Sequence, residues 1–314
     1  MSLALPRPRG LTWTVLRLHR IALWLWAGYV VVAAGVLLWL WGPGADGLSV
    51  NEPCGSGDAE FCAPIGPTAE MYKSALALVD VSLSTLPLVI AVFAGGVLFG
   101  RELERGTAQL AWTQSVTPFR WLVAKLAVPA LFLTAGTATL LALRRAVAAA
   151  EPGLSDNQWW TGPPYNLLGT TVIAFPLLGL ACGALGAVLQ RKAGAAAAFS
   201  GVLLILLAFC ADMLRPHLWP TRTVTGGVHE GYLSFRGEVT GDGAITGSGA
   251  HVGDPLCVGD TACLSDHDIT GFYTEGHPPS HFWPLQLTET ALLLALTAVT
   301  VALTYRILKR RVAV

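Results

Sequence analysis

The sequence predicts an all-α polytopic membrane protein with six transmembrane helices and a small disulfide-stapled extracytoplasmic loop domain. Hydrophobic residues make up 53% of the 314 residues and charged residues only 13%, against about 25% charged in soluble globular domains. Six apolar runs approach the roughly 20 residues that a helix needs to cross the hydrocarbon core of a bilayer. Charge is also segregated along the chain, although 20 Lys and Arg balance 20 Asp and Glu.

The six predicted spans are separated by segments of very different length. In chain order the spans are residues 21–41, 78–100, 126–145, 165–190, 193–214 and 284–306. The segments outside them are residues 1–20, 42–77, 101–125, 146–164, 215–283 and 307–314. The first apolar run follows a basic segment as in a signal peptide, but it is too long for one and no A-x-A cleavage site follows.

Charge orients the predicted spans, because short cytoplasmic loops carry an excess of Lys and Arg. With the N-terminus inside, 14 of the 20 basic residues fall on cytoplasmic segments, and Glu102 and Glu104 are the only acids there. Arg144 and Arg145 do not fit this pattern, and we expect them to reach the outer head groups. The prediction is a multi-pass protein of a bacterial inner membrane with both termini in the cytoplasm.

Four of the six cysteines lie in predicted outer segments, where an oxidising compartment permits disulfides. They are Cys54, Cys62, Cys257 and Cys263. Four cysteines allow three connectivities, and the short separations favour Cys54 with Cys62 and Cys257 with Cys263. A metal site is the alternative, although no C-x-x-C and no helical pair of histidines supports it.

The predicted outer segment 215–283 is long enough to form a small domain. Alternation over residues 232–239, followed by Gly-rich turn signals, predicts short strands. A domain of this size cannot bury a sufficient core alone, so a disulfide and packing on the spans must hold it. Six of the seven histidines lie here. They are predicted to be solvated, and two prolines between His277 and His281 argue against a shared helical face.

The chain carries no signature of a catalytic centre. A P-loop sequence and an H-E-x-x-H motif are both absent, so we assign no catalytic residue, metal or cofactor to this chain. Energy for work must therefore come from a partner or an ion gradient. Asp80, Asp212 and Glu289 lie near the outer ends of spans, and we interpret them as structural rather than as a proton relay or substrate contacts.

Small residues recur in three of the predicted spans, where they allow helices to approach closely. They are Gly95, Gly96, Gly179, Gly183, Gly186 and the alanines of residues 195–198. Packing within one bundle is the simpler interpretation, and a seam between two copies of the chain is the alternative.

The segment 101–125 is the most informative part of the sequence, because it is polar, carries both charge signs and lies between two apolar runs. Glu102 and Glu104 face an otherwise basic membrane surface, so they should pair with basic groups there or on another protein. A solvated connector with local pairs such as Glu102 with Arg105 is the alternative, and such pairs contribute only a few tenths of a kcal/mol.

The run E-x-E-x-G-T, formed by Glu102, Glu104, Gly106 and Thr107, is followed by the phrase LAWTQSVTPFRWL, which includes Arg120. This segment resembles the first cytoplasmic loop of type-2 (export-class) ABC transporter permeases, in particular the actinobacterial members. Six spans and cytoplasmic termini agree with this resemblance. In that family the loop carries a coupling helix that docks on an ATPase subunit, which implies the same role for residues 102–120.

The resemblance implies the membrane-spanning half of an exporter, with an ABC ATPase subunit that binds ATP-Mg and a second permease copy as partners. A homodimer is favoured over a heterodimer, and the substrate class is amphipathic antibiotics, peptides or lipids. The bilayer is the other partner, and the balanced charge leaves no footprint for nucleic acid. The alternative is a non-transporting membrane sensor or immunity protein that binds an extracellular ligand through its Cys-containing loops.

Overall fold

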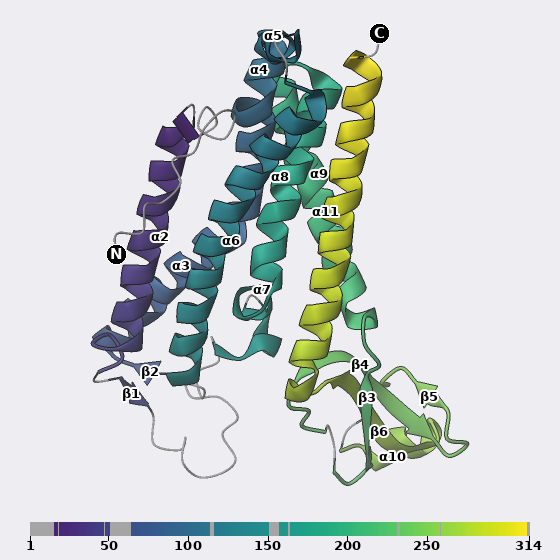
Figure 1. Ribbon diagram of the computed structural model, residues 1–314. Coiled ribbons are helices and arrows are strands. Elements are labelled where there is room, and N and C mark those ends of the chain that lie inside the picture. The colour runs from purple at the N-terminus through teal and green to yellow at the C-terminus, as the bar shows by residue number, and fades with distance from the viewer. Residues whose placement is uncertain are drawn as a thin grey trace, which may run out of the picture.

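The computed structural model describes residues 16–17, 19–46, 48–50, 64–113, 116–150, 157–162, 164–230, 233–257 and 259–312. Within these residues six helices are long and apolar enough to cross a membrane, which confirms the predicted number of spans. They lie side by side in one bundle (Figure 1). The helices are α2 (Arg20–Trp41), α3 (Pro67–Phe93), α6 (Pro118–Ala150), α8 (Thr171–Gln190), α9 (Ala193–Leu214) and α11 (Phe282–Val312).

Three of these helices are longer than their apolar runs. The helix α3 starts at Pro67, where proline suits the first helical turn, and continues through a π-helical segment, Ala94–Gly100, into α4 (Arg101–Glu104). The helices α6 and α11 also extend beyond the predicted spans. Hydropathy marks the part of a helix that suits hydrocarbon, whereas Ala, Glu, Leu, Lys and Arg beyond it still favour helix.

The predicted fourth span, 165–190, is two helices rather than one. The short helix α7 (Pro164–Leu168) is separated from α8 at Gly169, where a Cβ atom would lie 2.0 Å from Cδ of Gln286 on α11. The Gln286 amide donates to the Tyr165 carbonyl (2.7 Å) and accepts from the Thr171 backbone amide (3.2 Å). A side chain from the last helix thus occupies the break and satisfies backbone groups there.

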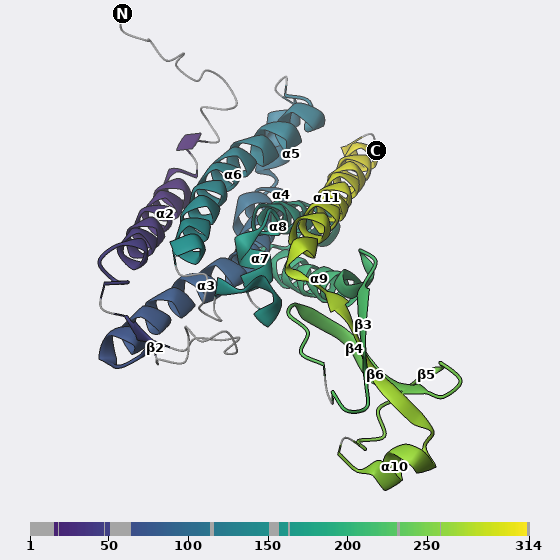
Figure 2. The same cartoon turned by 90° about the horizontal axis from the view of Figure 1, so that it is seen from below.

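Most of α8 is buried, and it lies in the middle of the bundle when viewed along the helices (Figure 2). A Cβ added at Gly183 would lie 2.4 Å from the Ala94 Cβ, and one at Gly186 would lie 2.2 Å from the Ser200 hydroxyl oxygen. These glycines therefore let α8 pack tightly against α9 and the chain that follows α3. This is the packing within one bundle that the small residues predicted.

The chain between α9 and α11 forms an antiparallel sheet of four strands in the order β3-β6-β4-β5. The strands are β3 (Arg222–Gly227), β4 (Glu238–Thr246), β5 (His251–Val252) and β6 (Ile269–His277), and the short helix α10 (Thr261–Asp266) packs beside them. The protein is therefore mostly helical rather than all-α, and the short strands predicted for residues 215–283 are present. The alternation over 232–239 falls mainly before β4, so it did not give the positions of these strands.

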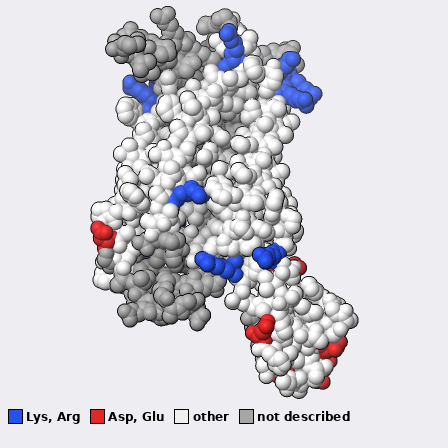
Figure 3. Space-filling model, turned by 60° about the horizontal axis from the view of Figure 1, so that its bottom comes forward, with Lys and Arg blue, Asp and Glu red and all other residues white. Residues whose placement is uncertain are grey.

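The two ends of the bundle differ in structure and charge. The α5 end carries α4, the short helix α5 (Thr107–Thr113) and the end of α11, whereas the sheet end carries β3–β6 (Figure 1). A small strand pair, β1 (Ser49–Val50) with β2 (Pro64–Ile65), also lies at the sheet end. On the face drawn in Figure 3, acidic side chains gather on the sheet domain, and basic side chains lie both at the opposite end of the bundle and next to the sheet domain.

Candidate functional site

The candidate functional site is the α4–α5 segment, which contains four of the five residues that the sequence singled out; the fifth, Arg120, lies at the start of α6. The helix α4 ends at Glu104, the chain turns through Arg105 and Gly106, and α5 begins at Thr107. Gly106 has φ of 71°, in the left-handed region that glycine adopts at little cost. The Thr107 hydroxyl donates to the Glu102 carbonyl (3.3 Å) across this turn. Gly106 and Thr107 thereby fix the direction of α5 relative to α4.

Glu102 forms an ion pair with Lys125 on α6. The Lys125 side chain is 3% exposed, and its Nζ also donates to the Leu98 carbonyl (2.8 Å) in the π-helical segment. The rings of Trp121 and Phe99 lie close to this ammonium, at 5.3 and 5.7 Å from Nζ to the centroid. Glu102 therefore ties α4 to α6, in place of the local pair with Arg105 that was the alternative.

Glu104 contacts a different helix. Its Oε2 accepts a hydrogen bond from the backbone amide of Ala193 (3.0 Å), the first residue of α9. The preceding residue, Lys192, provides no side-chain cap for this helix. A carboxylate at a helix N-terminus satisfies an otherwise unpaired amide and interacts favourably with the helix dipole. The two acids of the segment thus anchor α4 to α6 and α9.

The two sides of α5 differ in burial. Ala108 is buried, and the edge of the Trp112 ring meets Trp121 at 5.6 Å between centroids, so this side packs on the bundle core. The opposite side is exposed and carries Leu110, which is 62% exposed. Other exposed side chains of the α4–α5 segment and of the start of α6 are those of Arg101, Arg105, Gln109, Phe119 and Arg120. Exposed apolar and arginine side chains are typical of a docking surface for another protein.

At the sheet end, Arg144 is fully buried. Its guanidinium donates to both carboxylate oxygens of Asp80 on α3 (2.9 and 3.1 Å) and to the side-chain oxygen of Asn157 (2.8 Å). The expectation that Arg144 reaches the head groups was wrong, because Asp80 compensates its charge inside the protein. Arg145 is only partly buried, and it donates to the Leu168 carbonyl (2.8 Å) beside the Trp283 ring.

A second buried cation, Arg215, follows α9 directly. Its Nε lies 3.2 Å from the Glu289 carboxylate on α11, and its Nη1 lies 3.0 Å from the Asp212 carboxylate. The guanidinium also donates to the side-chain oxygen of Asn166 (3.2 Å) and stacks on the Tyr165 ring. Glu289, which is 2% exposed, therefore fits the structural interpretation, whereas Asp212 pairs with the same arginine but is 56% exposed.

Two of the histidines that were predicted to be solvated lie in contact. His277 at the end of β6 is fully buried. Its Nδ1 is 3.3 Å from Nδ1 of His281, and its Nε2 is 3.1 Å from the Pro216 carbonyl. The prediction was wrong for His277, because the sheet folds back onto the end of α9. The two prolines do keep the two rings off a common helix.

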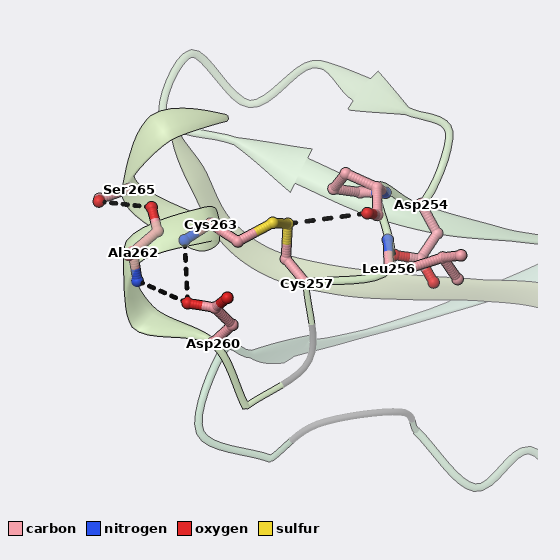
Figure 4. The surroundings of a disulfide bond; sticks show 8 residues. Asp254, Leu256, Cys257, Asp260, Ala262, Cys263 and Ser265 are labelled. Carbon is pink, nitrogen blue, oxygen red and sulfur yellow. Dashed lines mark hydrogen bonds between the residues drawn. A yellow bond between two sulfur atoms is a disulfide. The ribbon is translucent and has the colours of Figure 1, made fainter.

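The sheet domain contains a disulfide between Cys257 and Cys263 (Figure 4). Asp260 caps α10 by accepting from the backbone amides of Ala262 and Cys263 (3.0 and 3.2 Å). Although His267 lies close to both sulfurs, a disulfide leaves no thiolate for the metal site that was the alternative. Cys182 and Cys210, within the helices, are free. The predicted pair Cys54 with Cys62 lies outside the described residues.

Two grooves open between the helices of the bundle. One, of about 420 Å³, lies between α2, α3 and α6 and is almost entirely apolar, with Trp26, Tyr29 and Ser82 among its lining residues. The other, of about 470 Å³, lies between α3, α8 and α9 and has a polar end formed by Asn166, Asp212 and Arg215. The sequence feature that marked this second groove was Asp212, an acidic residue near the end of a predicted span.

A protein-family model described as "ABC-2 membrane transporter related" matches residues 27–215. The match covers more than half of the chain, so the protein belongs to this family. It is thus a multi-pass membrane protein, a permease component of an ABC transporter rather than an enzyme, with an ABC ATPase as its implied partner. The matched region includes the α4–α5 segment but not the sheet domain. No curated protein and no solved structure matches the chain significantly.

Proposed function

We propose that this chain is the permease subunit of an ABC exporter and that α5 is its coupling helix. The observation that carries the proposal is the anchoring of α4: it continues α3, pairs through Glu102 with Lys125 on α6, and caps α9 through Glu104. A push on α5 would therefore reach three membrane helices at once. Binding of ATP-Mg by a separate ATPase subunit would supply this push, and two permease copies, most simply identical, would form the pathway.

The proposed orientation places the α5 end in the cytoplasm, together with both termini, and the sheet domain outside. Two features support it. Lys and Arg predominate in the segments at the α5 end, and the Cys257–Cys263 disulfide suits an oxidising compartment. The membrane would be the inner membrane of a bacterium. The substrate would be an amphipathic molecule moved outward.

The contacts in the α4–α5 segment refine the proposed role of each residue. Glu102 and Glu104 would position the coupling helix, because both carboxylates already have partners within the chain. Gly106 and Thr107 would set its angle. Direct contact with the ATPase would fall to the exposed face of α5 that carries Leu110, together with the exposed side chains of Arg105 and Arg120. The matching ATPase surface would be an apolar groove with an acidic rim.

The π-helical segment Ala94–Gly100 suits the movement that this function requires. It joins α3 to α4, and one of its carbonyls, from Leu98, accepts the Lys125 hydrogen bond. Short π-helical stretches are uncommon and often occur at functional sites. We infer that this segment is the hinge at which a displacement of α5 becomes a rigid-body movement of α3.

The test is a pair of equivalent substitutions, Leu110→Asp on α5 and Leu256→Asp on the sheet domain. Both leucines are highly exposed, at 62% and 81%, so neither change should unfold the protein. Leu110→Asp should weaken binding of the ATPase by tenfold or more, since a central apolar contact contributes about 2 kcal/mol. Leu256→Asp should leave binding unchanged. Full ATPase binding by both variants would reject the role of α5 in docking the ATPase, and failure of the unsubstituted protein to bind an ATPase would favour the sensor alternative.

A further inference from the structure

The groove between α3, α8 and α9 is polar at one end and apolar along its length. Asp212 and Arg215 form the polar end, and Leu88, Phe175 and Leu204 line the body. Its volume of about 470 Å³ falls within the roughly 300 to 1,000 Å³ typical of small-molecule sites. From Asp212 to Leu204 the groove follows α9 for eight residues, which corresponds to about 12 Å at 1.5 Å per residue.

The polar end carries an excess of negative charge. One guanidinium, that of Arg215, lies between two carboxylates, Glu289 at 3.2 Å and Asp212 at 3.0 Å. The Glu289 side chain is 2% exposed, so it is the buried partner that neutralises the arginine. The Asp212 side chain is 56% exposed and lines the groove. Asp212 therefore presents a negative charge to any molecule that enters.

Arg215 is a poor site for an anion in this groove, because three of its five N–H donors and one face of its guanidinium already have partners. Besides its two carboxylate partners, it donates to Asn166 (3.2 Å) and lies 4.1 Å from the Tyr165 ring centroid. Glu289 does not line the groove, and Asp212 is the one carboxylate among the described lining residues. The charge that a ligand meets at this end of the groove is therefore negative, which favours a cation.

We propose that this groove binds an amphipathic organic cation, with its charged group against Asp212 and its apolar body along Leu88, Phe175 and Leu204. A single charge near the low-dielectric membrane interior attracts an opposite charge more strongly than in water. This inference rests on the proposed function, since the ligand would be the transported molecule.

Two probes of the same shape and opposite charge, tetraphenylphosphonium and tetraphenylborate, separate charge recognition from apolar affinity. Saturable binding would be measured on the purified full-length chain in phosphatidylcholine nanodiscs, after subtraction of binding to empty nanodiscs. We expect the cation to bind at least tenfold more tightly than the anion. Equal saturable binding of the two probes would overturn the proposal and leave an apolar groove filled by lipid or by a second copy of the chain.

Three variants locate the site. Asp212→Asn should lower the affinity for the cation at least tenfold, whereas Asp242→Asn, an equivalent change at an exposed aspartate of β4, should not. Ala208→Trp should fill the groove and lower the affinity for both probes. Unchanged cation binding by a folded Asp212→Asn protein would overturn the proposal. If that variant does not fold, unchanged cation binding by Ala208→Trp would do so.

The binding assay contains no ATPase, so its result is independent of the exporter role. A chain that associates with an ABC ATPase but shows no charge preference between the probes would refute the cation site alone. A chain that binds the cation through Asp212 but associates with no ATPase would refute the exporter role and leave the site in place.

Discussion

At each end of α6, a buried basic side chain binds α3 or the chain that continues it. The two basic residues differ in kind. At the sheet end, Arg144 of α6 binds both carboxylate oxygens of Asp80 and is fully buried. At the α5 end, Lys125 of the same helix pairs with Glu102 and with one backbone carbonyl. Arginine holds a planar, two-pronged geometry, whereas the lysine ammonium is a point charge on a flexible stem.

This difference indicates which end can move. The sheet end combines a fixed guanidinium, a disulfide and the inserted side chain of Gln286. The α5 end combines a rotatable ammonium with a π-helical segment next to it. In a permease that responds to an ATPase on one side, the helix ends near the ATPase must be able to shift while the opposite ends stay in place. We therefore expect substitutions at the sheet end to affect stability and those at the α5 end to affect coupling.

The largest effect should follow from Arg144→Met. It would leave Asp80 without its main partner in a buried site, and removing one member of such a pair costs about 3 to 5 kcal/mol. Unfolding of the purified protein with denaturant would measure the loss. Arg144→Lys should recover only part of it, because an ammonium cannot reproduce the two parallel bonds. A methionine variant as stable as the unsubstituted protein would contradict the assignment of Arg144 as a buried anchor.

Glu102→Gln should have a smaller effect on stability and a larger one on function. The pair is partly exposed on the Glu102 side, at 19%, and hydrogen bonds to charged groups contribute about 1.5 to 3 kcal/mol. We expect loss of stability within this range and loss of substrate-stimulated ATP hydrolysis by the complex. Glu70→Gln, at an exposed acid near the start of α3, is the matched control and should change neither. Normal coupling by Glu102→Gln would argue against the anchor role.

Gly106→Val should cost about 1 to 2 kcal/mol, because its backbone is left-handed and a Cβ disfavours that region. The turn between α4 and α5 would open, so ATP hydrolysis by the partner should no longer drive transport. Asparagine tolerates left-handed φ, so Gly106→Asn should retain most of the activity. Equal activity of the two variants would show that the angle of the turn does not matter.

The remaining effects concern pH and have opposite signs at the two ends. Burial, followed by the charge of Lys125, lowers the pKa of His19 at the start of α2 from 6.5 to about 4. Between pH 6.5 and 4 the unfolded chain binds a proton at His19 that the folded protein does not bind. The free energy of unfolding therefore decreases as pH falls from about 6.5 towards 4. Burial raises the pKa of Glu238 on β4 above 4.5. The folded protein then holds this proton more tightly than the unfolded chain, so the free energy of unfolding decreases as pH rises above 4.5.

Two glutamine variants would separate these contributions. His19→Gln should flatten the fall in stability between pH 6.5 and 4, and Glu238→Gln should increase stability at neutral pH. Unfolding transitions followed at several pH values would measure both. An unchanged pH dependence in each variant would show that neither group titrates differently on folding.

The sequence predicted those features that depend on local composition. Six spans and the Cys257–Cys263 bond follow from hydropathy and short separation. The burial of Arg144 was missed because its partner Asp80 is 64 positions away, and without that partner an arginine at the end of a span is expected to reach water. The break before α8 depends on Gln286 from another helix. These are contacts between distant residues, which one sequence does not reveal.

The candidate site shows the same division. The sequence predicted where the site lies in the chain and singled out Glu102, Glu104 and Gly106. It also showed their resemblance to the first cytoplasmic loop of ABC permeases. The partners of the acids could not be predicted, since Lys125 follows Glu102 by more than 20 positions and Ala193 lies on α9. Those contacts moved the expected ATPase surface from Glu102 and Glu104 to the face of α5 that carries Leu110.

The most direct test of the central claim is site-specific photocrosslinking from Leu110 in native membranes, with Val202 as the control. Both side chains are more than half exposed, but Val202 lies on α9 within an apolar span. We expect a crosslinker at position 110 to capture a protein with a P-loop ATPase sequence and one at position 202 not to do so. Capture of no such ATPase at 110, or equal capture at both positions, would contradict the proposal that α5 couples this permease to ATP hydrolysis.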